Sequence, residues 1–310
     1  MAIEPRALWA CCLFPLALAG AAAECSLPEA AHQGSCILQT VARVMTPHAQ
    51  QVQALTQARV VNFPIEWMHV PKCGSSFVNS IVQIPGACTG IPPDYTYEDI
   101  NSSSPLTQFQ EVARQQCKDG IDADRVMHPG VEDIPGWEEG KGRFMIMLRR
   151  PEQRLLSFYY FFLQELNYTL SSDTLSKYGG CVVKTLVRKF PHPDGLSCAG
   201  DPVSDEEIAE AKERLRTGFA FIGIAEQWDL SICLFNKIFG IRRCHAAQFE
   251  NTRPTNGRNS TEYDVSELGD WHDDDNEIYD LAKRLFEDKL LEYNVNNLSC
   301  QSCWQEAGLV

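Results

Sequence analysis

Residues 65–84 read IEWMHVPKCGSSFVNSIVQI, and this stretch decides the expected fold. The apolar residues between Ile65 and Val70 predict a buried strand, and those from Phe77 to Ile84 predict a helix. Between them lies a short turn that contains Lys72 and Gly74. A strand that passes through a glycine-containing turn into a helix is typical of a phosphate-binding edge in an α/β protein.

The chemistry of this turn suits an anion. Backbone N–H groups at the start of a helix have no partner within the helix, and the helix dipole favours negative charge there. Lys72 adds a cation, and Gly74 allows the backbone to approach a ligand closely. In the P-loop of ATPases and GTPases the lysine follows the last glycine, whereas Lys72 precedes Gly74. A P-loop kinase or nucleotidase would also need a metal-binding Asp directly after an apolar strand, and the strands at 145–148 and 219–224 lack one.

A second segment, residues 143–160, reads RFMIMLRRPEQRLLSFYY. Phe144 to Leu148 predict a buried strand, and Pro151 suits the first turn of a following helix. Arg149 lies at the strand end, and Ser157 lies on the helix three residues after Arg154. Because a guanidinium presents a planar fork of donors, this segment suits recognition of a second phosphate.

Together the two segments resemble sulfotransferases that use 3′-phosphoadenosine 5′-phosphosulfate (PAPS), particularly the Golgi carbohydrate sulfotransferases. In that family a Pro-Lys-Thr-Gly-[Gly/Ser]-Thr loop holds the 5′-phosphosulfate, and an Arg-Asp-Pro-x-x-Arg-x-x-Ser-x-Tyr segment holds the 3′-phosphate. The stretches Phe219–Glu226 and Asp275–Leu290 also resemble the family, so the similarity spans residues 63–290 in scattered blocks.

The resemblance implies a set of nucleotide-binding residues. The 5′ loop would comprise Lys72, Cys73, Gly74, Ser75, Ser76 and Phe77, and the 3′-phosphate ligands would be Arg149 and Ser157. Two positions depart from the family pattern, since Cys73 replaces the usual Thr and Arg150 the usual Asp. Arg154 has two possible roles besides phosphate binding: it could support the 5′ loop, or it could pair with Glu226.

Transfer of a sulfuryl group to an alcohol needs a base that accepts the alcohol proton. Lys72 is the expected catalytic cation, and His128 is the expected base because it follows a short predicted strand and precedes Pro-Gly. Glu132 and Asp133 in the same loop are the alternatives, and His128 as an ordinary turn residue is the competing interpretation. His69 is expected to pack within or beside its strand.

Composition limits the partners. The 310 residues are 44% hydrophobic, which is enough for a sizeable core, and the formal net charge is −14. So acidic a chain is not expected to bind nucleic acid or a broad polyanion. The expected acceptor is a hydroxyl on a carbohydrate; a peptide or small-alcohol hydroxyl is the alternative.

The N-terminal residues predict entry into the secretory pathway. Residues 1–23 resemble a signal peptide, because Arg6 is followed by an apolar run and by small residues up to Ala23. The alternative is that this segment is an uncleaved membrane anchor, and membrane contact is expected only in that case. We expect a helical lead-in over 24–62, the α/β domain over 63–295 and a C-terminal tail over 296–310.

Cysteines and sequons agree with the Golgi lumen or secretion. Eleven of the 13 cysteines follow Ala23, and N-x-Ser/Thr sequons occur at Asn101, Asn167, Asn259 and Asn297. Plausible disulfides are Cys25–Cys36, Cys88–Cys117, Cys181–Cys198, Cys233–Cys244 and Cys300–Cys303, although sequence alone cannot establish them. Eleven is odd, and Cys73 is expected to stay unpaired.

The predicted fold class is α/β, with a central parallel sheet, helices on both faces, a sulfotransferase-like topology and disulfide-braced insertions. The expected strands are about 65–70, 125–127, 143–148 and 219–224. The expected helices are about 77–84, 105–117, 151–166, 204–216, 227–239 and 275–292, and 179–200 is an expected loop-rich insertion.

Three further patterns have alternatives. Residues 271–275 read WHDDD, which predicts an acidic start to the last long helix rather than a metal site. Residues 159–162 read YYFF and are expected mainly in the core, with one ring available to stack on adenine. No metal is expected. The alternative function is a secreted binding protein that has the sulfotransferase scaffold without catalysis.

Overall fold

The computed structural model describes residues 63–92, 105–117, 119–121, 137–188, 198–252 and 262–310. Within this part, three parallel strands form one sheet in the order β1 (Glu66–Met68), β2 (Phe144–Leu148), β3 (Phe219–Ile224). All five residues of β2 are buried, as its central position requires. Because the strands are parallel, their carboxyl ends meet at one edge of the sheet.

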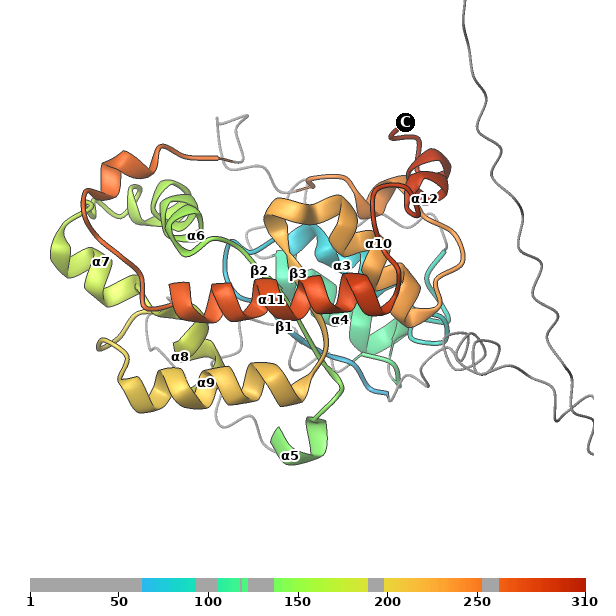
Figure 1. Ribbon diagram of the computed structural model, residues 1–310, viewed down its shortest axis with the longest axis horizontal. Helices are drawn as coiled ribbons and strands as arrows, with labels where there is room; N and C mark the ends of the chain where they lie inside the picture. Colours follow the sequence, from blue (N-terminus) through green and yellow to red (C-terminus); the bar gives the residue numbers. More distant parts are fainter. Residues whose placement is uncertain (1–62, 93–104, 118, 122–136, 189–197, 253–261) are drawn as a thin grey trace, which may run out of the picture. The chain divides into compact units, whose positions relative to one another are not determined.

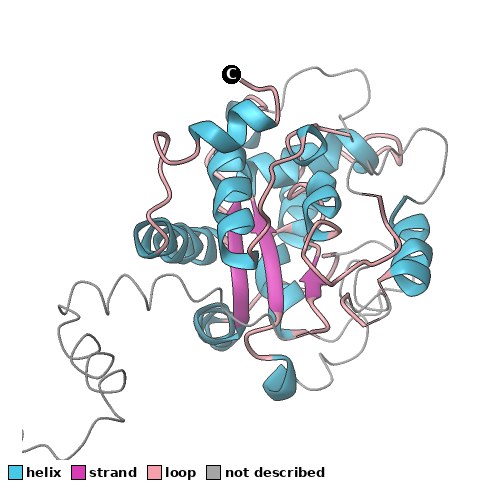
Figure 2. Ribbon diagram, turned by 90° about the vertical axis from the view of Figure 1, so that its right-hand side faces the viewer, coloured by secondary structure: helices cyan, strands magenta, loops and turns pink. Residues whose placement is uncertain are grey.

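Helices surround the sheet, and Figure 2 shows them on either side of the strands. The α-helices are α3 (Val78–Ile81), α4 (Pro105–Gln116), α5 (Trp137–Gly140), α6 (Pro151–Phe158), α7 (Ser172–Tyr178), α8 (Cys181–Val187), α9 (Asp205–Gly218), α10 (Trp228–Phe239), α11 (Asn276–Glu292) and α12 (Gln301–Glu306). The 3₁₀ turns are η1 (Ser75–Phe77), η4 (Ala225–Gln227), η5 (Ala246–Gln248) and η6 (Val265–Leu268), and η3 (Tyr159–Leu163) is a π-helical turn. In Figure 1 α11 crosses in front of the strands, where it packs on β3 and α9.

These observations confirm the α/β class, the parallel sheet and most of the predicted elements. The helix expected from residue 204 begins at a capping box, in which Ser204 and Glu207 each bond the other's backbone N–H. The strand over 219–224 has the expected bounds. Residues 1–62 and the strand expected near 125–127 lie outside the described residues.

Three expected elements differ in detail. The helix expected over 151–166 is α-helical only to Phe158 and then widens into η3, where Gln164 N–H donates to Tyr159 O. Four consecutive aromatic side chains crowd this turn, and aromatic residues lose side-chain freedom against a regular α-helical turn. The helix expected over 77–84 is a 3₁₀ turn followed by α3, and the insertion over 179–200 contains α8.

Four disulfides brace the described residues. Cys88–Cys117 and Cys181–Cys198 are the predicted pairs. The local pairs predicted for Cys233 with Cys244 and for Cys300 with Cys303 were wrong, because the bonds are Cys233–Cys300 and Cys244–Cys303. Local spacing favoured the nearer partners, whereas the fold places the first residues of α12 beside α10 and the segment that follows it. Cys25 and Cys36 lie outside the described residues.

The segment expected as a C-terminal tail is thus held covalently. Residues 296–310 include α12, and both Cys300, at the start of this short helix, and Cys303, within it, are in disulfides. Disulfides persist in oxidising compartments, so the four bonds are compatible with an extracellular or secretory-pathway protein. Among the described residues, no helix has the length and apolar character needed to cross a membrane.

Candidate functional site at the carboxyl edge of the sheet

The turn between β1 and η1 adopts an unusual backbone conformation. Lys72 has φ +67°, and Gly74 has φ +91°. A left-handed conformation costs a residue with a Cβ about 1–2 kcal/mol. Such strain concentrates at ligand-binding and catalytic turns. Lys72 is half-buried, whereas Cys73 is completely buried.

Trp228, the first residue of α10, packs directly beneath Gly74. A Cβ added to Gly74 would lie 2.6 Å from Trp228 Cζ3, which is closer than such contacts allow. Trp228 is fixed in turn, since its Nε1–H donates to Gln248 O at 2.9 Å. Position 74 therefore requires glycine, both because its φ is positive and because Trp228 leaves no space for a Cβ. Through this contact the turn packs on α10.

Arg149 brings the second predicted phosphate segment to this turn. It directly follows β2, and its Nη1 donates to the carbonyl oxygen of Lys72 at 3.5 Å. Strands β1 and β2 are neighbours in the sheet, so the turn after β1 and the start of α6 lie side by side. The structure thus brings together Lys72 and Arg149, which come from segments 77 residues apart.

Aromatic rings hold both cations. The Lys72 Nζ lies 3.7 Å from the centroid of the Phe161 ring in the π-helical turn η3, within cation–π range. The Arg149 Cζ lies 5.6 Å from the Tyr263 ring. Tyr263 is held by Gln153 of α6, whose side-chain amide bonds both Tyr263 N (2.8 Å) and Tyr263 O (2.9 Å). Of the four aromatic residues at 159–162, Phe161 is therefore the one placed against Lys72.

The serines of the turn have different environments. Ser75 is half-buried, whereas Ser76 is buried and its Oγ accepts hydrogen bonds from Thr252 N and Thr252 Oγ1, both at 3.1 Å. A hydroxyl that accepts two bonds still has its own proton to donate. Phe77 is a core residue whose ring stacks on Phe221 of β3 at 5.5 Å. Phe77 thus anchors the turn through packing.

Cys73 is the free cysteine that the sequence predicted. Burial raises the pKa of its thiol to about 12, although the nearby Arg154 and Arg149 act in the opposite direction. A thiolate is therefore disfavoured at neutral pH, and Cys73 behaves as a small buried hydrophobic residue.

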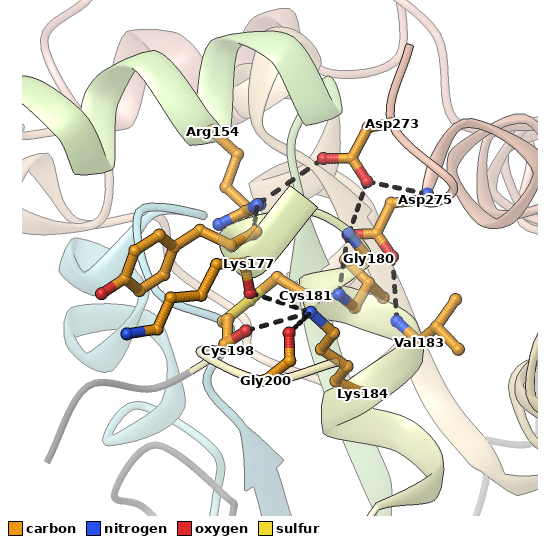
Figure 3. Close-up of a disulfide and its surroundings, with 12 residues drawn as sticks. Arg154, Lys177, Gly180, Cys181, Val183, Lys184, Cys198, Gly200, Asp273 and Asp275 are labelled. Carbon is orange, nitrogen blue, oxygen red and sulfur yellow. Dashed lines mark hydrogen bonds and ion pairs between the residues drawn. A yellow bond between two sulfur atoms is a disulfide. The ribbon is translucent and has the colours of Figure 1, made fainter. Parts of the chain in front are cut away.

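Ser157 and Arg154 lie inside the protein. Ser157 is 2% exposed within α6, which differs from the exposed position expected of a phosphate ligand. The pairing proposed between Arg154 and Glu226 was wrong: Arg154 Nη2 donates to Tyr178 O at 2.9 Å and lies 3.7 Å from Asp273 Oδ2 (Figure 3). Arg154 is fully buried within α6, whereas Arg150, the N-cap residue of that helix, is 44% exposed at the end of the sheet.

The acidic run at 271–275 lies at the start of α11, as predicted, and its carboxylates also cap a second helix, α8. Asp275 accepts hydrogen bonds from Val182 N and Val183 N, and Asp273 accepts one from Gly180 N (Figure 3). These amides begin α8, whereas Asp275 makes no side-chain cap on α11. Burial raises the pKa of Asp275 to about 7, an effect that the two backbone donors oppose. In the described part of the chain, no three His, Cys, Asp or Glu side chains are arranged to hold a metal ion.

Lys184 completes this interior cluster. It is fully buried, and its Nζ donates to the carbonyl oxygens of Lys177, Cys198 and Gly200 at 3.0, 3.3 and 3.4 Å (Figure 3). Burial lowers the pKa of Lys184 to about 8. The cluster joins α6, α8 and the Cys181–Cys198 disulfide in the protein interior and has the contacts of a structural support.

Glu226 is the residue at this edge whose importance sequence reasoning missed. Its Oε1 accepts a hydrogen bond from Arg150 N at 2.8 Å, and its Oε2 accepts one from Tyr279 OH at 3.0 Å. Its position two residues after β3 was a usable signal, because ligands and their supports gather at the carboxyl ends of parallel strands. Each of the three strands thus contributes a charged residue to the same edge: Lys72, Arg149 and Glu226.

The expected base lies beyond what the structure describes. His128, with its alternatives Glu132 and Asp133, falls within residues 122–136, outside the described residues. His69 was predicted to pack with its strand, and this is confirmed: it is 4% exposed, and its ring centroid lies 4.7 Å from that of Trp67. Comparison of the chain with protein-family models, with curated proteins and with solved structures found no match.

Proposed function

We propose that this protein is a sulfotransferase that moves a sulfuryl group from PAPS to an acceptor hydroxyl, with a carbohydrate as the expected acceptor and a P-loop sulfotransferase-like fold. The observation that carries the proposal is the contact between Arg149 and the carbonyl of Lys72. It unites the two segments whose residue types suit the two phosphate groups of one nucleotide. Adjacent parallel strands bring both segments to the end of the sheet where ligands of such folds bind, which supports a shared task for Lys72 and Arg149.

The residues at this edge partly fit such a nucleotide. Lys72, Arg149 and the spare proton of Ser76 provide two cations and a neutral donor for anionic oxygens. Lys72 must leave the Phe161 ring to reach a phosphate, and a flexible four-carbon side chain allows this. The burial of Ser157 fits less well, since its hydroxyl would have to be uncovered to bind the 3′-phosphate.

In this proposal each residue has a defined task. Transfer breaks the bond between sulfur and a phosphate oxygen, forms a bond between sulfur and the acceptor oxygen, and passes the acceptor proton to a base. Lys72 offsets the negative charge that develops on the departing phosphate, and Arg149 holds the nucleotide in place. His128 is the proposed base, with Glu132 or Asp133 as the alternatives.

The test combines binding and transfer. Calorimetry with 3′-phosphoadenosine 5′-phosphate measures nucleotide binding, and radiolabelled PAPS with a panel of glycans and peptides measures transfer. We expect Lys72→Ala to reduce kcat about 10²–10³-fold and Arg149→Ala to weaken nucleotide binding at least about tenfold. Lys141→Ala is the matched control, because Lys141 is also a partly exposed lysine but lies in the turn before β2. Folded variants with unchanged binding and turnover would refute the proposal.

The alternative is a secreted binding protein on the same scaffold that has lost catalysis. The burial of Ser157 and the contacts of Ser76 with Thr252 favour it, because they cover two side chains expected to bind nucleotide. A wild-type chain that binds no nucleotide and transfers no sulfate to any acceptor would support this alternative.

A further inference from the structure

The strand end that carries Arg149 is fixed by a carboxylate from the neighbouring strand. Glu226 lies in η4 directly after β3, and β3 pairs with β2 up to Leu148 and Ile224. Its Oε1 receives the backbone N–H of Arg150 at 2.8 Å. This hydrogen bond holds the peptide that joins Arg149 to Arg150, at the point where β2 ends and α6 begins.

The carboxylate is itself held by a third element. Tyr279 of α11 donates its hydroxyl to Glu226 Oε2 at 3.0 Å, so both oxygens of Glu226 have partners. Burial and the neighbouring carboxylate raise the pKa of Tyr279, which therefore remains protonated and able to donate. Only 21% of the Glu226 side chain is exposed, and its geometry is thus set by β3 and α11 together.

The negative charge of Glu226 is unexpected so close to a proposed anion site. Arg149 and Lys72 are the cations of the proposed anion site, and a carboxylate near them repels an anionic ligand. The charge of Glu226 alone therefore weakens the binding of an anion, and its presence suggests that the carboxylate has a structural role in the site. Arg149 directly follows β2, so the position from which its side chain extends is set by the peptide that Glu226 holds.

We propose that Glu226 is a positioning residue for the anion site, which fixes the backbone beneath Arg149 and is oriented by Tyr279. This inference rests on the proposed function, because it assigns Glu226 a task in the binding of a nucleotide phosphate by Arg149. Charge alone predicts that loss of Glu226 tightens anion binding; positioning predicts that the same loss weakens it.

A matched control is available in Glu262. Its carboxylate pairs with the Arg150 side chain at 2.8 Å and is 70% exposed. Glu226 also pairs with that side chain, at 3.6 Å from Arg150 Nε, but in addition it accepts the Arg150 backbone N–H. Glu226→Ala and Glu262→Ala thus remove the same charge from carboxylates that pair with the same residue. Only the first removes the acceptor of the Arg150 backbone N–H.

The experiment measures binding of 3′-phosphoadenosine 5′-phosphate to the purified full chain by calorimetry. We expect Glu226→Ala to weaken binding on the order of tenfold and Tyr279→Phe several-fold, while Glu262→Ala binds as the wild type does or slightly more tightly. Glu226→Gln, which keeps an oxygen for the Arg150 N–H, should retain most of the affinity. If the Glu226→Ala protein does not fold, the affinity of the Tyr279→Phe protein for the nucleotide tests the inference in its place.

A double-mutant cycle separates positioning through Arg149 from general damage. In the Arg149→Ala background, Glu226→Ala should have little further effect on affinity. Tighter or unchanged binding by folded Glu226→Ala, or an undiminished effect in the Arg149→Ala background, overturns the inference while the proposed function stands. Absence of nucleotide binding by the wild type, or wild-type affinity in Arg149→Ala, overturns the proposed function and this inference with it.

Discussion

Gly74→Ala tests the packing of the candidate phosphate turn on α10. The new methyl group would lie 2.6 Å from Trp228 Cζ3, so the turn or the indole ring must move. Overpacking of this kind costs about 1–3 kcal/mol. The φ of +91° at Gly74 adds about 1–2 kcal/mol of backbone strain for a residue with a Cβ. Together these costs predict a loss of about 2–5 kcal/mol in the free energy of unfolding.

Gly240→Ala is the matched control. Gly240 also has a left-handed backbone, with φ +67°, but nothing lies within 4 Å of its added Cβ. Its substitution should cost only the strain of about 1–2 kcal/mol. The difference between the two variants, measured by urea denaturation, isolates the clash with Trp228.

Two outcomes would contradict this reasoning. The first is a Gly74→Ala protein no less stable than the Gly240→Ala protein. The second is an undiminished cost of Gly74→Ala in the Trp228→Leu background, where the six-membered ring that meets the methyl group is gone. Because Lys72 lies two residues from Gly74, the same variant should also weaken nucleotide binding if the proposed function is correct.

Three other measurements test separate parts of the structure. Burial raises the pKa of Cys73 to about 12, so iodoacetamide should label Cys73 in urea but not in the native protein; rapid native labelling located by mass spectrometry would contradict its burial. Burial lowers the pKa of Lys184 from 10.5 to about 8. Between these two pH values the unfolded state binds more protons than the folded state, so the free energy of unfolding should rise with pH. The rise should be at most about 1.4 kcal/mol per pH unit. Lys184→Met should remove this rise in parallel urea titrations, and an identical slope in both proteins would refute the assignment. Non-reducing peptide mapping should join Cys233 to Cys300, whereas a peptide linking Cys233 to its predicted partner Cys244 would contradict the fold of the C-terminal residues.

The sequence predicted the regular parts of the fold because local signals determine them. The capping box at Ser204 and Glu207 marks the start of α9, and the apolar run over 219–224 marks β3. Adjacency of the Lys72 turn and the Arg149 segment was also predictable, since both follow apolar strands expected in one parallel sheet. Each of these predictions rests on short motifs, whose own residues lie close together in the sequence.

What the sequence did not predict depends on tertiary contacts. Asp273 and Asp275 precede α11 in the chain, yet they cap α8, which lies about 90 residues earlier. The link between Phe161 and Lys72 requires the π-helical turn, and hydrophobic periodicity does not distinguish a π turn from an α turn. The role of Glu226 likewise depends on Tyr279, a residue 53 positions away.

The pairing of Cys233 with Cys300 and of Cys244 with Cys303 has a consequence for any protease that meets this protein. Both bonds span the stretch between residues 244 and 300, so one backbone cut in that stretch leaves the two fragments covalently joined. Such a nicked molecule would migrate as an intact chain on a gel until a reductant is added. It would also keep Tyr263 and Tyr279 attached to the remainder of the molecule, so that cleavage would not by itself remove them from the proposed site.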